Sequence, residues 1–218
     1  MKWLVIAANR LNHVDIYRWD GQNATLTKRI STSKTPSHLW IDSQSKIVWA
    51  SMQDSDEIVA IELGTQTLKS RTAVGATPAD LFGTPDDKFL LVAAMGSDGV
   101  EVYDISSAQP KWVKKIPTGK GAHAFRSLGD KRHVMVSNRV ANSISQIDYL
   151  NMDVVADFPG PSGPDCMDIT ADGKNILVAS RWAKKLTVID IATRKVVRQI
   201  RVGKSPHGVW TLDHAPRN

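Results

Sequence analysis

The sequence predicts an all-β protein, a β-propeller of about five four-stranded antiparallel blades that forms a single domain over residues 1–218. Three observations lead to this prediction. A short segment recurs at a fixed period, each period contains four strand-like stretches, and the two ends of the chain carry complementary parts of one repeat. Hydrophobic residues make up 42% of the chain, an ordinary share for a globular protein.

The recurring segment starts with proline or glycine and, in its first four copies, reaches a lysine in a turn ten residues later. The copies begin 42, 43, 43 and 42 residues apart, at Pro36, Pro78, Gly121, Pro164 and Pro206. A period of this length is typical of propellers and solenoids. It divides the chain into repeats at approximately 36–77, 78–120, 121–163 and 164–205, with one more blade shared by 206–218 and 1–35.

Within each period the strands follow a constant order. The first strand is the recurring segment, which ends in a turn such as Ala-Asp-Gly-Lys at 171–174, where Asp-Gly favours a tight hairpin. The second strand is apolar and β-branched, as at 176–179; the third alternates, as at 186–190; the fourth is exemplified by 195–202. One aromatic position recurs in the first strand, and we expect it to pack between blades: Trp40, Phe82, Phe125 and Trp210.

The ends of the chain complete one blade between them. The chain begins with a second-strand segment at 3–8 and finishes with a first-strand segment at 207–213. We therefore expect the N- and C-terminal strands to pair and close the ring, because pairing removes the open sheet edges that invite aggregation.

The composition restricts the compartment and the kinds of partner that we expect for this chain. The single cysteine, Cys166, cannot form an internal disulfide, and no apolar run approaches the ~20 residues that span a bilayer. The apolar run at 3–8 is too short for a signal peptide, so the chain as given is expected to be cytoplasmic, or periplasmic if an upstream leader is missing. The net charge of +6 comes from scattered lysines and arginines, which makes nucleic acid an unlikely partner.

Residues 186–209 resemble the repeat of the YVTN β-propeller family. Ala-Ala-Asn at 7–9 and Val-Ser-Asn at 136–138 stand where that family has Val-Ala-Asn, and weaker copies cover nearly the whole chain. The resemblance implies relatives that are mostly periplasmic or surface-associated, often of unassigned function, and distantly similar to haem-binding nitrite reductase propellers. Family members usually have about seven blades and many carry an export signal, so this chain is either a compact five-bladed form or lacks upstream blades and a leader.

The repeat alignment gathers polar residues at one end of the central channel. In a propeller, the loops that lead into the first strand and those that join the second strand to the third lie on the same face. The aligned positions in these loops predict the following ligand-binding residues: Arg10, His38, Asp80, His123, Arg139, Asp165, Arg181 and His207. Cys166 occupies an aligned position too, but a lone cysteine is more typical of a small buried hydrophobic residue.

This set of residues has three interpretations. Arginines and protonatable histidines suit a small anionic ligand, because a guanidinium binds carboxylate or phosphate in a bidentate manner. Histidine, carboxylate and thiol also suit a transition metal, although we assign no metal ligands from the sequence and leave the cofactor unknown. A third interpretation is purely structural, with these side chains shaping the start of each first strand.

The sequence contains no complete catalytic motif. It lacks a Gly-x-Ser-x-Gly elbow, a phosphate-cradling glycine loop and a His-Glu-x-x-His helix, so it does not settle whether the protein is an enzyme. We predict a non-catalytic binding or scaffold module that engages a small anionic ligand or a protein partner at the channel mouth. The alternative is a propeller enzyme, a lactone hydrolase or a metal- or haem-dependent oxidoreductase, with His38, His123 and His207 as candidate bases.

Overall fold

The computed structural model describes residues 2–107 and 109–216, which form nineteen strands and two short 3₁₀ helices. The first sheet contains β1 (Lys2–Ala8), β2 (His13–Trp19) and β3 (Ala24–Ser31), with η1 (Asn9–Leu11) between β1 and β2. The second contains β4 (Pro36–Ile41), β5 (Ile47–Met52), β6 (Glu57–Glu62) and β7 (Thr67–Ala73). The third contains β8 (Pro78–Gly83), β9 (Phe89–Ala94), β10 (Gly99–Asp104) and β11 (Lys111–Ile116), with η2 (Met95–Ser97) after β9. The fourth contains β12 (Ala122–Ser127), β13 (His133–Asn138), β14 (Ser143–Asp148) and β15 (Asp153–Pro159). The fifth contains β16 (Pro164–Ile169), β17 (Asn175–Ser180), β18 (Lys185–Asp190) and β19 (Lys195–Arg201).

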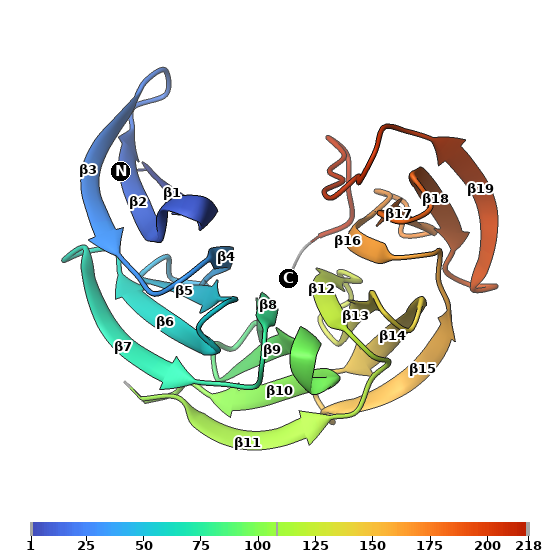
Figure 1. The fold of residues 1–218 in the computed structure, drawn as a ribbon, viewed down its shortest axis with the longest axis horizontal. Coiled ribbons are helices and arrows are strands. Elements are labelled where there is room, and N and C mark those ends of the chain that lie inside the picture. The colour runs from blue at the N-terminus through green and yellow to red at the C-terminus, as the bar shows by residue number, and fades with distance from the viewer. Residues whose placement is uncertain (1, 108, 217–218) are drawn as a thin grey trace.

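The sheets are arranged around one axis, which confirms the predicted all-β propeller fold. Each sheet is an antiparallel meander in which strands adjacent in sequence are hydrogen-bonded neighbours. In Figure 1 the inner strands β4, β8, β12 and β16 line the centre, and β3, β7, β11, β15 and β19 form the rim. The apolar second and third strands lie between these and supply most of the buried core.

The recurring aromatic position packs between blades, as the repeat predicts, for three of its four members. The ring of Phe82 in β8 lies 5.1 Å from that of Trp40 and 6.1 Å from that of Phe125, measured between centroids. Aromatic pairs at such distances add to the hydrophobic stabilisation between neighbouring inner strands. Trp210 is the exception, since 62% of its surface is exposed.

Within the described residues, the predicted pairing of the N- and C-terminal strands is wrong. The first sheet contains only β1, β2 and β3, and no residue of 206–216 pairs with β1. Figure 1 shows the resulting opening between the first sheet and the fifth, with the C-terminal segment turned toward the axis. Its only β-bridge among the described residues joins His214 to Thr170, at the end of the inner strand of the fifth sheet.

A buried ion pair explains where the C-terminal segment lies. Arg126 in β12 donates from Nε to Asp168 Oδ1 at 2.8 Å, and both residues are almost fully buried. The Nη atoms of Arg126 donate to the carbonyl oxygens of Ala215 and Pro216, and Asp168 accepts a 2.8 Å hydrogen bond from the backbone amide of Thr211. These contacts hold the segment against β12 and β16, away from β1.

No helix in the described part of the chain is long and apolar enough to cross a membrane.

We predict that Asp168→Ala destabilises the protein by about 3–5 kcal/mol, because it removes the carboxylate from a buried guanidinium. For a chain of this size the melting temperature should fall by about 6–20 °C in a calorimetric scan. The control is Asp153→Ala, which breaks the exposed pair with Lys114 and should cost less than about 1 kcal/mol. Equal melting temperatures for the two variants would contradict the assigned role of Asp168.

We expect acid to lower the free energy of unfolding, and protonation of Asp168 to account for part of this loss. Burial acts to raise the pKa of Asp168, but hydrogen bonds from Arg126 and from the amides of Thr211 and Ile169 outweigh it and hold the pKa below its ordinary value. A carboxyl group with a depressed folded pKa stabilises the protein above its unfolded pKa of about 3.9, and this stability is lost as the pH falls further. Urea unfolding between about pH 5 and pH 2 should therefore show a shallower decline for Asp168→Ala than for wild type.

Candidate functional site

Each inner strand has a register shift where the sequence places a candidate side chain. In β4 and β8 the ladder skips from Pro36 to Leu39 and from Pro78 to Leu81, and in β16 it skips from Pro164 to Met167. The shift in β12 lies between Ala122 and Ala124. Bulges of this kind re-aim side chains. The residues within the shifts include His38, Asp80, His123, Asp165 and Cys166.

Serine side chains stabilise two of these irregular starts. The amide of His38 donates to Ser51 Oγ at 3.1 Å, and the amide of Ala124 donates to Ser137 Oγ at 3.2 Å. Both serines lie on the neighbouring second strands and are fully buried. They replace ladder hydrogen bonds that the register shift removes, so the buried amides remain satisfied.

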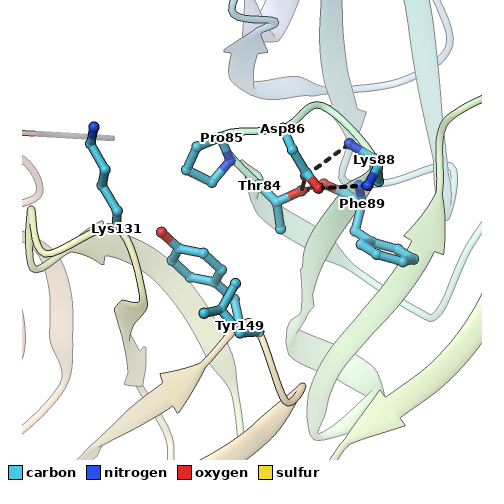
Figure 2. Close-up of a pocket in the computed structure, with 8 residues that line it drawn as sticks. Thr84, Pro85, Asp86, Lys88, Phe89, Lys131 and Tyr149 are labelled. Carbon is cyan, nitrogen blue, oxygen red and sulfur yellow. Dashed lines mark hydrogen bonds and ion pairs between the residues drawn. The ribbon is translucent and has the colours of Figure 1, made fainter.

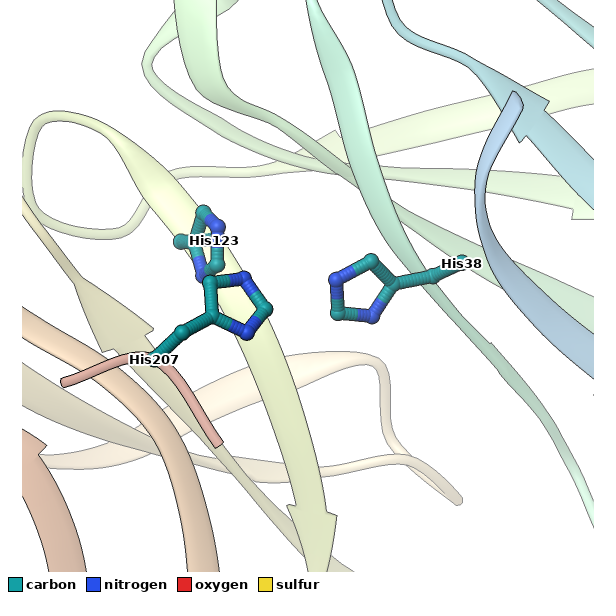
Figure 3. A group of neighbouring side chains, drawn as sticks. All are labelled: His38, His123 and His207. Carbon is teal, nitrogen blue, oxygen red and sulfur yellow. The ribbon is translucent and has the colours of Figure 1, made fainter. Parts of the chain in front are cut away.

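Three histidines from separate parts of the chain meet at the channel mouth. His38 comes from β4, His123 from β12 and His207 from the C-terminal segment, and Figure 3 shows their rings facing a common space. The ring centroids are 5.8 Å apart for His38 and His123, 6.1 Å for His38 and His207, and 6.0 Å for His123 and His207. The three rings therefore form a nearly equilateral triangle.

Two carboxylates lie beside these rings. Asp80 Oδ1 lies 2.9 Å from His38 Nδ1, and Asp80 Oδ2 accepts a hydrogen bond from the amide of Phe125. Asp165 is fully buried, and its Oδ1 lies 3.3 Å from His123 Nδ1 and 3.6 Å from His207 Nε2. Each histidine thus has a carboxylate beside one of its two ring nitrogens.

Two arginines share the same buried carboxylate. Arg139 Nη2 donates to Asp165 Oδ2 at 2.8 Å and also contacts His123 Nε2. Arg181 Nε lies 3.3 Å from Asp165 Oδ2, within ion-pair range but without the alignment of a hydrogen bond. The Nε atoms of both arginines and Nδ1 of His123 are buried, and none of them has a hydrogen-bond partner in the described structure.

Burial and neighbouring charges set the protonation of the cluster. Burial lowers the pKa of His123 to about 2, reinforced by the charge of Arg139, so this ring is neutral. Burial also lowers the pKa of His207, against the attraction of Asp165. For His38, burial acts to lower the pKa, but Asp80 and Asp165 outweigh it and the pKa is raised. Burial raises the pKa of the Cys166 thiol, which is therefore not an anion at neutral pH.

The structure brings together seven of the eight residues that the repeat alignment selects. Arg10 is the exception: it lies exposed in η1, and no hydrogen bond or ion pair joins it to the cluster among the described residues. Sequence reasoning missed Met95, whose Sδ lies 3.8 Å from Arg139 Nη1. Met95 stands at the repeat position that Arg139 and Arg181 occupy in later blades, so its place in the period was the available signal. That these residues bind a ligand stays a prediction.

A separate cavity of about 270 Å³ lies at the opposite face, where the turns between first and second strands gather. It is lined by Pro85, Phe89 and Tyr149, with Lys88 and Lys131 at its edge (Figure 2). None of the residues predicted from the sequence contributes to it. The cavity and the histidine cluster are therefore distinct features of the molecule.

The radial sheets and the polar channel mouth define this protein as a β-propeller with a candidate ligand site on its axis. Its sequence matches the model of the YNCE-like beta-propeller family over residues 1–217, and the chain belongs to that family. The narrower resemblance to YVTN repeats remains a prediction.

Solved structures support the fold. A hydrazine synthase chain from Kuenenia stuttgartiensis has a TM-score of 0.67 and 27% identity, over 76% of this chain and 48% of its own length. This chain thus spans about half of that protein. A functionally unknown protein from Desulfotomaculum acetoxidans DSM 771 has a TM-score of 0.72 and 10% identity, over 97% and 86% of the two chains.

A candidate 6-phosphogluconolactonase from Bacteroides uniformis ATCC 8492 has a TM-score of 0.77 and 17% identity, over 94% of this chain and 69% of its own. At this identity the likeness shows the propeller fold alone. No curated protein matches the chain.

Proposed function

We propose that this protein is a non-catalytic binding module that holds a small anionic ligand at the channel mouth through Arg139 and Arg181. The observation that carries the proposal is the shared carboxylate: both guanidinium groups face the single buried Asp165. The other carboxylate of the cluster, Asp80, is paired with His38.

The charges around Asp165 do not balance without a ligand. Arg139 and Arg181 carry two positive charges, and Asp165 supplies one negative charge to both. A partly buried positive charge without a counter-ion is costly, since its desolvation is not repaid. A carboxylate or phosphate group would supply the missing charge, and its oxygens would accept charge-assisted hydrogen bonds from the two guanidinium groups.

The accessibility of the side chains indicates the direction from which a ligand would approach. The side chain of His207 is 50% exposed and that of Arg181 is 31% exposed, whereas His123 and Asp165 are buried beneath them. A small anion can therefore reach Arg181 from solvent while its inner oxygens approach Arg139. A protein partner that presents an acidic side chain to the mouth would use the same contacts.

We expect the purified protein to bind inorganic phosphate or a dicarboxylate such as oxalate in isothermal titration calorimetry. Arg139→Met and Arg181→Met should each weaken binding by about 10- to 100-fold, because each removes charge-assisted hydrogen bonds worth about 1.5–3 kcal/mol. Arg198→Met, in the exposed strand β19, is the matched control and should bind like wild type. Equal affinities in all four proteins would refute an anion site at the mouth.

A second candidate function is a propeller enzyme. The observation in its favour is the pair formed by His38 and Asp80, since a histidine oriented by a carboxylate is a common general base. The 27% identity to a hydrazine synthase chain also supports an enzyme, although this chain spans only about half of that protein.

We expect no saturable hydrolysis of a simple lactone such as γ-butyrolactone, because the proposed module holds its ligand without turnover and burial keeps Cys166 a neutral thiol rather than a nucleophile. A pH-stat assay of the wild-type protein measures this directly. Saturable turnover that disappears in a folded His123→Ala variant would make the protein a lactone hydrolase instead.

A further inference from the structure

We propose that His38, His123 and His207 bind one divalent transition-metal ion, such as Zn²⁺ or Co²⁺, at the channel mouth. One ring nitrogen from each histidine lies within 4.8 Å of those of the other two. The proposal deepens the anion site and rests on it in that the anion would fill an open position on the metal and offset the positive charge that the ion adds beside Arg139 and Arg181.

The spacing of the three rings is close to that of a three-histidine metal site. Metal–nitrogen distances of about 2.0–2.1 Å in tetrahedral geometry place the ring centroids roughly 5 to 5.5 Å apart. The observed centroid distances are 5.8, 6.0 and 6.1 Å. Each pair would therefore need to approach by about 1 Å or less, which side-chain rotation can supply.

A carboxylate of the cluster lies beside one nitrogen of each ring, at hydrogen-bond distance for His38 and at ion-pair distance for His123 and His207. Metal-binding histidines usually donate their second ring N–H to a carboxylate, which fixes the tautomer and the direction of the free lone pair. Asp80 lies beside Nδ1 of His38 and leaves Nε2 for a metal. Asp165 lies beside Nε2 of His207 and Nδ1 of His123, leaving the opposite nitrogen of each ring.

A cationic group already occupies the position that the metal would take at His123. Arg139 Nη2 contacts His123 Nε2, and a guanidinium can only donate, so this nitrogen must be the acceptor with its lone pair toward Arg139. His123 is only 4% exposed, and its Nδ1 has no hydrogen-bond partner among the described residues. We infer that a metal ion and Arg139 compete for Nε2 of His123.

Three histidines fit better than the other group of neighbouring ligand atoms, His123, Asp165 and Cys166. Asp165 is already shared by two arginines, and the buried thiol of Cys166 is neutral. Three imidazoles around a tetrahedral ion leave a fourth position open to an anion. Arg139, once displaced from His123, would keep its contact with Asp165 and could bind the outer oxygens of that anion.

The test uses tag-free protein that has been dialysed against a chelator and then titrated with Co²⁺, whose visible absorption reports tetrahedral coordination. Zn²⁺ affinity is measured in parallel by competition with a chromophoric chelator. We expect one ion per chain. Single variants His38→Ala, His123→Ala and His207→Ala should lose more than about 100-fold in affinity, and Asp80→Asn about 10- to 100-fold.

One control and one variant within the cluster make the result specific. His133→Ala removes a histidine of β13 that pairs with Asp130, outside the cluster, and should leave metal affinity unchanged. Arg139→Met should bind the metal more tightly than wild type, because it removes the cation that competes for Nε2 of His123, and an unchanged or weaker affinity would contradict that competition. His207 is half-exposed on an irregular segment, so His207→Ala should keep the fold even if His123→Ala does not.

The possible outcomes distinguish the metal site from the anion site. Absence of metal binding, or equal affinity in wild type and His207→Ala, overturns the metal site whatever the protein does with phosphate. Phosphate binding to the metal-free protein, lost in Arg181→Met, would then leave the anion site standing alone. Metal binding that depends on the three histidines, with no phosphate binding in either the metal-free or the metal-loaded protein, upholds the metal site and refutes the anion site.

Discussion

The channel mouth depends on a backbone irregularity that every inner strand repeats. In a regular strand, side chains alternate between the two faces of the sheet, and all of them would point at neighbouring blades. The register shift at the start of β4, β8, β12 and β16 interrupts this alternation at the residues that form the cluster. The site is therefore built into the repeat itself, and hydroxyl groups such as those of Ser51 and Ser137 satisfy the amides that the shift releases.

The buried Asp165 links the residues of the cluster through electrostatic contacts. Burying a carboxylate costs several kcal/mol unless its oxygens are well satisfied. Here Arg139, Arg181, His123 and His207 all lie against it, and they come from two sheets and the C-terminal segment. Exposed pairs such as Lys114 with Asp153 contribute little by comparison. Because one buried group serves four partners, a change at any of them alters the surroundings of the others.

Most of the fold and the position of the cluster could be predicted from the sequence, since both follow from the period. Equivalent repeat positions lie at equivalent heights along the channel, so His38 and His123 could be placed together without knowledge of their contacts. Arg10 lies outside the cluster because the first sheet has only three strands. It lacks the strand that corresponds to β4, β8, β12 and β16 in the other sheets. The prediction of ring closure was wrong because it used only the local strand preference of residues 207–213. The position of this segment depends instead on tertiary hydrogen bonds from Arg126 and to Asp168, which the repeat pattern of the sequence does not reveal.

The open ring also determines how the molecule can come apart. Repeats that contact only their neighbours behave like a short linear array, in which an end unit has one interface and an interior unit has two. Among the described sheets the first and the fifth each have one neighbour, so their amides should exchange with solvent before those of the third and fourth. The cluster draws its residues from β4, β8, β12, β16 and the C-terminal segment, and thus crosses four of the five sheets. A ligand bound there would cross-link the repeats, so it would slow fraying of the fifth sheet and leave the first sheet to open on its own.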